Sequence, residues 1–152
     1  SYRSMLGGVL AQETDRAVET TAEMKPVTKV APTAEELTDL VFATKLVKHS
    51  KSNAIVLAKG GQLIASGVGQ TSRVDALKQA IEKARHFGFD LKGAVLASDA
   101  FFPFDDCVTL AAEAGITAIA QPGGSVRDAD SIAAADRLGV AMVMTGVRHF
   151  KH

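Results

Sequence analysis

The spacing of apolar residues along the chain predicts two helices in its first half. Thr33 and Glu36 fit a capping box, in which the hydroxyl and the carboxylate each accept a free backbone amide at the helix start. Apolar side chains then recur every three or four residues, which predicts an amphipathic helix over residues 33–49. The same spacing predicts a second helix from Val74 to about Phe87, with Gly88 as its end.

Between these helices lie two short apolar runs, residues 54–58 and 62–68, separated by the sequence Lys-Gly-Gly. Adjacent glycines tolerate the positive φ angles of a tight turn, so this segment predicts a β-hairpin.

The second half alternates short apolar runs with helical stretches. The runs cover residues 93–98, 116–120 and 140–144, and helices are expected at 106–114 and 128–138. Strands that are apolar throughout are typical of a parallel sheet covered on both faces. We therefore predict an α/β protein, a three-layer sandwich with a mixed sheet in which a hairpin precedes βαβαβ crossovers. This order of elements is that of the cytidine-deaminase-like fold.

The first 31 residues differ from the rest. Residues 6–12 could form a strand, but no clear periodicity follows them up to residue 31. We interpret residues 1–31 as an incomplete segment from the preceding part of a longer protein, and residues 32–152 as the folded domain.

Composition narrows the function classes. Seventeen basic and seventeen acidic residues give a net charge of zero, so we expect neither a nucleic-acid nor a membrane partner. The single cysteine, Cys107, excludes an internal disulfide and a multi-cysteine zinc site. We expect a cytoplasmic protein.

Three polar or aromatic loops follow the three predicted parallel strands. They are SDAFFPFDD (98–106), QPGGSVRD (121–128) and TGVRHFKH (145–152). Ligands of doubly covered sheets gather at the carboxyl ends of the strands, so these loops are expected to converge on one site.

Each loop has a functional and a structural interpretation. The phenylalanines near Asp106 suit a flat heteroaromatic ligand, or they plug the end of the sheet while Asp105 or Asp106 caps the next helix. The amides after the two glycines could meet an anion or a carbonyl oxygen, or Ser125 or Asp128 caps an ordinary turn.

The remaining polar candidates lie in the basic tail and beside the hairpin. Arg148 could bind a phosphate, or it belongs to a solvated tail; we expect no metal at the nearby histidines. Asn53 and Arg73 bracket the hairpin and could project toward one ligand, or they are a turn residue and a surface residue. Lys48 and His49 are expected on a solvated last helical turn rather than as an acid–base pair.

Taken together, the segments KSNAIVLAKGGQLIASGVGQTSR, LASDAFFPFDD, AGITAIAQPGGS and VAMVMTGVRHF resemble one family. It is the bifunctional purine-biosynthesis family, in its aminoimidazole carboxamide ribotide (AICAR) transformylase portion. RSMLGGVLAQ and VTKVAPTAEEL resemble the same proteins just upstream, so the similarity covers essentially the whole chain.

The resemblance implies transfer of a formyl group from the cosubstrate 10-formyltetrahydrofolate to the 5-amino group of AICAR, in the biosynthesis of IMP. The residues that match the family's AICAR contacts are Asn53, Arg73, Phe101 and Arg148, with Asn53 also orienting the reacting amine. Those that match its folate site are Val74, Pro103, Phe104, Asp106, Ser125 and Val126. The family needs no catalytic metal, leaves room for a structural monovalent cation, and assembles its site across a homodimer.

Two parts of the family pattern are missing from this sequence. The segment Phe-Lys-His-Val-Ser-Pro-Ala-Gly, which carries the proton-transfer pair, is not present, and neither is the cyclohydrolase domain. We therefore expect a fragment with little or no transformylase activity alone. The alternative is a noncatalytic module that binds a phosphoribosyl ligand or folate, or that dimerises. A zinc nucleobase deaminase would need His-x-Glu and Pro-Cys-x-x-Cys, and the sequence has neither.

Overall fold

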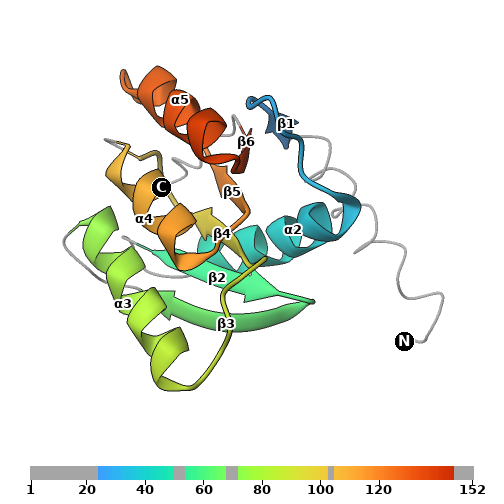
Figure 1. Cartoon of the computed structure of the whole chain (residues 1–152), viewed down its shortest axis with the longest axis vertical. Coiled ribbons are helices and arrows are strands. Elements are labelled where there is room, and N and C mark those ends of the chain that lie inside the picture. Colours follow the sequence, from blue (N-terminus) through green and yellow to red (C-terminus); the bar gives the residue numbers. More distant parts are fainter. Residues whose placement is uncertain (1–23, 50–53, 68–71, 103–104, 146–152) are drawn as a thin grey trace.

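The computed structural model describes residues 24–49, 54–67, 72–102 and 105–145. Within these ranges, strands form one mixed sheet in the order β1-β6-β5-β4-β2-β3 (Figure 1). The strands are β1 (Lys25–Pro26), β2 (Ile55–Lys59), β3 (Gln62–Gly67), β4 (Val95–Ser98), β5 (Ala118–Gln121) and β6 (Ala141–Met144). The helices are α2 (Ala34–Lys48), α3 (Arg73–His86), α4 (Asp106–Ala114) and α5 (Asp128–Leu138).

Strand directions follow the predicted topology. β4, β5 and β6 are parallel neighbours, joined by the crossover helices α4 and α5. β2 is antiparallel to both β3 and β4, and β1 is antiparallel to β6. The predicted hairpin followed by βαβαβ crossovers is therefore confirmed.

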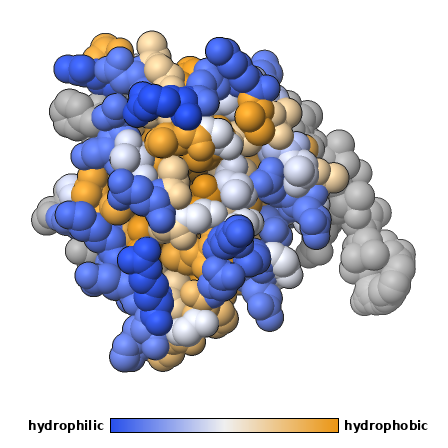
Figure 2. Space-filling model, viewed as in Figure 1, coloured by the Kyte–Doolittle hydropathy of each residue, from blue (hydrophilic) through white to orange (hydrophobic). Residues whose placement is uncertain are grey.

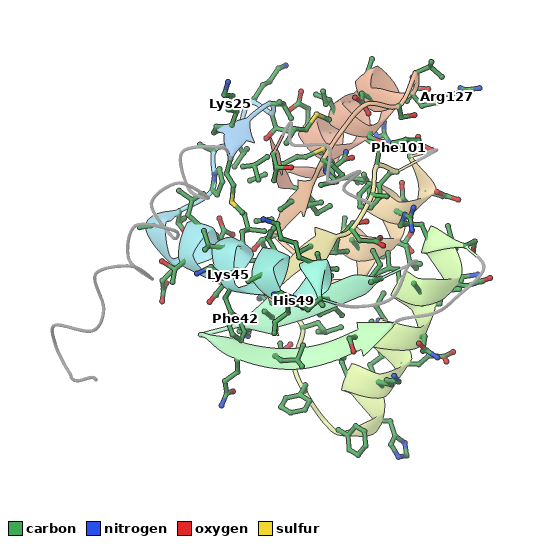
Figure 3. All side chains as sticks on the ribbon, turned by 180° about the vertical axis from the view of Figure 1, so that it is seen from behind. Lys25, Phe42, Lys45, His49, Phe101 and Arg127 are labelled. Carbon is green, nitrogen blue, oxygen red and sulfur yellow. The ribbon has the colours of Figure 1, made fainter. Side chains whose placement is uncertain are left out.

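Helices cover both faces of the sheet. α2 packs on β2, β4 and β5, and it lies in front of the sheet when the molecule is seen from behind (Figure 3). α3, α4 and α5 cover the opposite face, whose outer surface carries hydrophilic side chains with apolar groups between them (Figure 2). The three-layer sandwich is confirmed. None of the helices in the described ranges combines the length and apolarity needed to cross a membrane.

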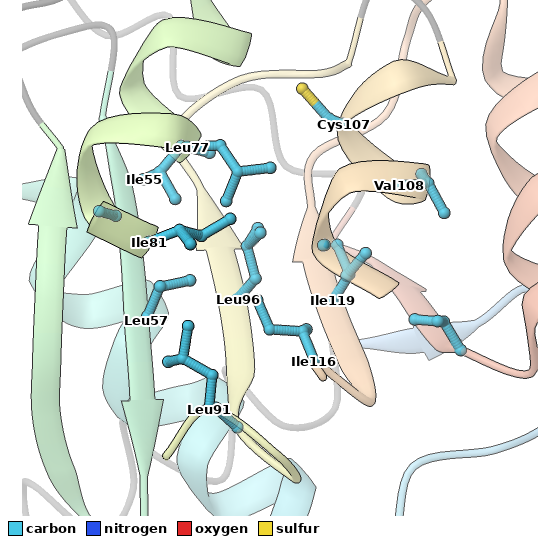
Figure 4. Close-up of a cluster of buried hydrophobic side chains, with 14 of the residues drawn as sticks. Ile55, Leu57, Leu77, Ile81, Leu91, Leu96, Cys107, Val108, Ile116 and Ile119 are labelled. Atoms are coloured by element: carbon cyan, nitrogen blue, oxygen red, sulfur yellow. The ribbon is translucent and has the colours of Figure 1, made fainter. Parts of the chain in front are cut away.

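The two faces of the sheet carry side chains of different size, because alternate strand residues point to opposite sides. Toward the three helices, Ile55, Leu57, Leu96 and Ile119 form the centre of a large core with Leu77 of α3 (Figure 4). Toward α2, the buried residues of β2, β4, β5 and β6, together with Ala54 just before β2, are all Ala or Val: Ala54, Val56, Ala58, Val95, Ala97, Ala118, Ala120, Ala141 and Val143. These small side chains let a single helix cover that face.

The capping box predicted for α2 is present. Glu36 N donates to the Thr33 hydroxyl over 3.1 Å, and Thr33 N donates to Glu36 Oε1 over 2.9 Å. The second oxygen of Glu36 accepts a 2.6 Å hydrogen bond from the hydroxyl of Thr117, just before β5. The cap thus fixes the helix start and also ties it to the sheet.

The hairpin turn is closed by a carboxylate from α2. Gly60 and Gly61 adopt φ angles of 61° and 77°, as the Gly-Gly pair predicts. Their amides donate to the two oxygens of Asp39, over 3.0 and 2.8 Å. Asp39 is only 8% exposed, so this contact gives a buried charge the partners that it needs.

One strand was not predicted. Lys25 and Pro26 pair with Met144 and Val143 at the edge of β6, and Val27 N continues the contact by donating to Met142 O over 3.0 Å. A two-residue strand has no periodicity to read from a sequence. The strand predicted at residues 6–12 lies outside the described residues, and the domain boundary at residue 31 stays a prediction.

Candidate functional site

The structure gathers several loops at one edge of the sheet, which we call the carboxyl edge. The parallel strands β4, β5 and β6 all end there, and the antiparallel β2 begins there, with Ile55 opposite Ser98. β3 ends at the same edge, with Gly67 opposite Ile55. The described residues of this edge are Ala54, Ser72–Val74, Asp99–Phe102, Asp105–Asp106, Pro122–Asp128 and Thr145. The described parts of the three predicted loops therefore lie together at the carboxyl edge.

Arg73 lies at this edge as the first residue of α3, after the N-cap Ser72. Its Nη1 donates to Asp99 Oδ1 over 3.3 Å, and both side chains are 13% exposed. The same oxygen of Asp99 accepts the Ala54 amide over 3.1 Å. The structure thus places Arg73 beside the start of β2. Asn53, the residue before Ala54, lies outside the described residues.

The two described phenylalanines of the aromatic loop differ in burial. Phe102 is completely buried and belongs to the large core, as the plug interpretation requires. Phe101 is 38% exposed and is available to a ligand. Asp105 occupies the N-cap position of α4 without a side-chain capping hydrogen bond, so the capping alternative is wrong for this residue. Pro103 and Phe104 lie outside the described residues.

The charges of Asp106 and Arg73 both affect the pKa of a buried thiol, that of Cys107. Cys107 is completely buried, and burial raises its pKa from 9.0 to about 12. The Asp106 carboxylate also raises this pKa, whereas the Arg73 guanidinium lowers it. Val74, half buried, packs against the large core next to Arg73. The charges of a predicted folate residue and of a predicted AICAR residue thus shift the pKa of this thiol in opposite directions.

The double-glycine loop is held by its own side chains. Gly124 N and Ser125 N donate to the two oxygens of Asp128, over 2.8 and 3.1 Å, and Gly123 N donates to Gln121 Oε1 over 3.2 Å. These amides are therefore not available to an anion. Asp128 is the first residue of α5 and accepts amides of the preceding loop, whereas the N-cap residue is Arg127 and makes no side-chain capping hydrogen bond, so the expected helix cap at Ser125 or Asp128 is wrong. The anion interpretation of this loop is wrong for these amides.

Ser125 and Val126 form the tip of the same loop. The hydroxyl of Ser125 accepts the Arg127 amide over 2.9 Å, and Val126 is 99% exposed. Phe101 and Arg127 lie on the same side of the molecule in the rear view (Figure 3). A fully exposed apolar side chain at the tip of a loop, such as Val126, suits contact with a ligand or partner.

The other polar candidates are placed as follows. Lys48 and His49 end α2 and are both exposed, as expected for a solvated last turn. Thr145 N donates to Gln121 O over 3.0 Å and so begins the tail at the carboxyl edge, whereas Arg148 lies outside the described residues. In the part of the chain that the structure describes, no three His, Cys, Asp or Glu side chains gather as a metal site.

Sequence reasoning did not single out Asp99, which joins Arg73 to the start of β2. Its signal was available, because Asp99 directly follows the buried strand β4 at the edge where ligands gather. The buried Gln121 follows the same rule, as the last residue of β5, and it holds the Gly123 amide.

Comparison with known proteins places the chain in a family. A family model described as the AICARFT/IMPCHase bienzyme matches residues 1–83, more than half of the chain. The chain belongs to this family. The bifunctional purine biosynthesis protein PurH of Bacteroides thetaiotaomicron is 66% identical over 99% of the chain, which covers 30% of that protein. PurH of Aquifex aeolicus is 55% identical, again over 99% of the chain and 29% of that protein. This AICARFT/IMPCHase member thus spans about 30% of the length of the relatives that it matches.

Solved structures agree on the fold. The diaminohydroxyphosphoribosylaminopyrimidine deaminase/5-amino-6-(5-phosphoribosylamino)uracil reductase of Thermotoga maritima superimposes with a TM-score of 0.53, at 24% identity over 71% of this chain and 35% of that one. The dCMP deaminase of cyanophage S-TIM5 gives a TM-score of 0.51, at 19% identity over 70% of this chain and 94% of that one. The cytidine-deaminase-like fold is therefore confirmed, whereas such distant likeness carries no chemistry.

Proposed function

We propose that this chain is part of an AICAR transformylase, which transfers a formyl group from 10-formyltetrahydrofolate to AICAR in IMP biosynthesis in the cytoplasm. One observation carries the proposal: residues assigned to AICAR and to folate from three separate segments lie at one carboxyl edge. They are Arg73 and Val74 on α3, Phe101 and Asp106 around the β4–α4 loop, and Ser125 and Val126 in the β5–α5 loop.

The AICAR side of the site combines a planar donor with an aromatic ring. The guanidinium of Arg73 is a planar array of N–H donors, fixed in direction by the contact of Nη1 with Asp99, and such an array suits a carboxamide. The exposed ring of Phe101 offers a flat apolar face to the imidazole. Arg148 would hold the phosphate, and Asn53 would orient the weakly nucleophilic amine toward the formyl carbon.

The folate side is more apolar and carries a carboxylate. Val74 and the exposed Val126 offer apolar contacts, and the exposed Asp106 can accept N–H groups of a pterin. Ser125 adds a hydroxyl at the tip of its loop. Pro103 and Phe104, between Phe101 and Asp106 in the sequence, would complete this side.

The proposal requires further residues from outside this chain. Lys48 and His49 lie on an exposed last turn of α2, outside the sequence context of the family's proton-transfer pair. The remaining part of a longer protein, in the same subunit or in the partner subunit of a homodimer, would supply that pair, and no metal takes part. We expect the isolated chain to show little or no formyl transfer.

A second candidate function is a noncatalytic module that binds AICAR or folate, or that dimerises. The observation that favours it is the pair of exposed apolar side chains at the carboxyl edge, Phe101 and Val126, which suit binding and carry no acid–base chemistry. Such a module would use the same edge and would not depend on a proton-transfer pair.

Binding and turnover together test the proposal. Calorimetry with AICAR and with a reduced folate measures binding, and formyl transfer is assayed on the full-length protein that contains this sequence. Arg73→Ala should weaken AICAR binding about tenfold to hundredfold, because a charge-assisted hydrogen bond is worth about 1.5–3 kcal/mol.

The matched control is Arg127→Ala, which removes an exposed arginine that pairs with Asp130 over 3.1 Å on α5. This variant should bind AICAR as the wild type does. Ligand binding without formyl transfer by the full-length protein would favour the noncatalytic module, and an absence of binding to either ligand would contradict both functions.

A further inference from the structure

The carboxylate of Asp99 joins three elements at the carboxyl edge. It follows β4 directly, and its Oδ1 accepts the Ala54 amide at the start of β2 and Nη1 of Arg73 on α3, over 3.1 and 3.3 Å. The main chain reinforces this contact, because Asp99 N donates to Ala54 O over 3.2 Å. The carboxylate is therefore anchored to the sheet at Ala54 and holds the long, flexible side chain of Arg73.

This arrangement restricts an otherwise flexible group. An arginine side chain has many rotamers, and holding it in one of them before a ligand arrives lowers the entropic cost of binding. Both Arg73 and Asp99 are only 13% exposed, so water competes weakly for their contact. The ion pair thus fixes the direction of the guanidinium relative to the strands.

A second carboxylate at this edge has different surroundings. Asp106 is the first residue of α4 and is exposed, whereas the Asp99 side chain is only 13% exposed and is bound to the start of β2. The buried carboxylate is therefore the better fixed point for the guanidinium.

We propose that Asp99 is a positioning residue for AICAR, which acts by holding the Arg73 guanidinium against the start of β2. This inference rests on the proposed function, since it assigns AICAR to Arg73. Asp99 itself need not touch either substrate.

Steady-state kinetics of the full-length protein test this role through two Michaelis constants. Asp99→Ala should raise the KM for AICAR about tenfold or more and leave the KM for 10-formyltetrahydrofolate within about twofold, because a charge-assisted contact orients only the AICAR side. Asp99→Asn keeps an acceptor atom but loses the charge, so it should raise the KM for AICAR by a smaller factor. A loss of folded protein would instead lower the apparent kcat and leave both KM values unchanged.

The double variant Arg73→Ala/Asp99→Ala gives the sharpest test. If Asp99 acts only through Arg73, the double variant should lose no more AICAR affinity than Arg73→Ala alone. Asp130→Ala is the matched control, since it breaks an exposed Arg–Asp pair on α5 and should change neither KM.

The outcomes separate this inference from the function on which it rests. Additive losses in the double variant, an equal rise in both KM values, or wild-type constants in Asp99→Asn would overturn the role of Asp99. The asparagine variant decides the matter if Asp99→Ala fails to fold. A full-length wild type that neither binds AICAR nor transfers formyl would instead contradict the proposed function, and the assignment of Asp99 with it.

Discussion

The two edges of the sheet use carboxylates differently. At the amino edge, where the parallel strands begin, Asp39 accepts the main-chain amides of Gly60 and Gly61. At the carboxyl edge, Asp99 divides one oxygen between a main-chain amide and the side chain of Arg73. The first carboxylate completes a turn, whereas the second also directs a functional group. Substitution of the amino-edge carboxylate should therefore affect stability alone, whereas substitution of the carboxyl-edge carboxylate should affect ligand binding.

The largest effect is expected where α3 approaches the end of β3. A Cβ atom on Gly67 would lie 2.0 Å from the carbonyl oxygen of Ala76, a main-chain atom that cannot move alone. Gly67→Ala should therefore lower the free energy of unfolding by about 3 kcal/mol or more, measured by urea denaturation. A variant as stable as the wild type would show that α3 is not packed this closely on the carboxyl edge.

The buried carboxylate of the amino edge should matter next. Asp39→Ala leaves two turn amides without their charged partner, and we expect a loss of about 2 kcal/mol in the free energy of unfolding. AICAR binding by the folded variant should not change. Asp90→Ala is the control, because this carboxylate is exposed and accepts a single amide, from Lys92 over 3.0 Å. Weakened AICAR binding in Asp39→Ala would remove the distinction between the edges.

The thiol under the carboxyl edge predicts a dependence on pH. Folding raises the pKa of Cys107 from 9.0 to about 12, so the unfolded chain releases this proton first as the pH rises. The free energy of unfolding should then fall between pH 9 and 12, by up to about 1.4 kcal/mol per pH unit. Cys107→Ala should lack this part of the decrease, which the difference between the two denaturation series measures. Parallel curves would refute a desolvated thiol.

A smaller effect is expected in the hairpin turn. Gly61 has a φ of 77°, but no atom lies within 4 Å of the position that the methyl group of an alanine would take there. Gly61→Ala should therefore cost only the conformational penalty, about 1 kcal/mol in the free energy of unfolding. Calorimetric unfolding beside Gly67→Ala separates this backbone penalty from a steric clash, and equal losses in the two variants would contradict that separation.

The smallest effect on stability is expected at the tip of the β5–α5 loop. Val126 is 99% exposed, so Val126→Ser should change the free energy of unfolding by less than about 0.5 kcal/mol. Burial of its methyl groups against folate would be worth about 1 kcal/mol, so folate binding should weaken about fivefold in calorimetry. Unchanged folate affinity would remove Val126 from the site.

Much of the fold could be predicted because local rules dominate it. The capping box at Thr33, the Gly60–Gly61 turn and the apolar runs of β4, β5 and β6 each act over a few residues, and each is found where the sequence places it. Some strand ends differ from the prediction by one or two residues. The sequence predicts β4 at 93–98, but the strand begins at Val95, because Gly93 belongs to a turn.

The unpredicted features depend on contacts between distant residues. Arg73 and Asp99 are 26 positions apart, so no local sequence pattern links them. Asp99 follows the buried strand β4, and Arg73 is the first residue of α3. Asp128 accepts the Gly124 and Ser125 amides and Ser125 accepts the Arg127 amide, an arrangement that depends on the path of the two glycines, which the sequence leaves open. The edge pairing of Lys25 and Pro26 is of the same kind.

That edge pairing sets a limit on how far the chain can be shortened. Lys25 and Pro26 cover Met144 and Val143, and Pro26 has no N–H to offer to a further strand. A polypeptide that began at residue 32 would keep every helix described above but would expose the main-chain groups of β6. Unprotected edges of this kind pair with other molecules, so such a protein should aggregate during expression, and residues 24–30 belong in any soluble version.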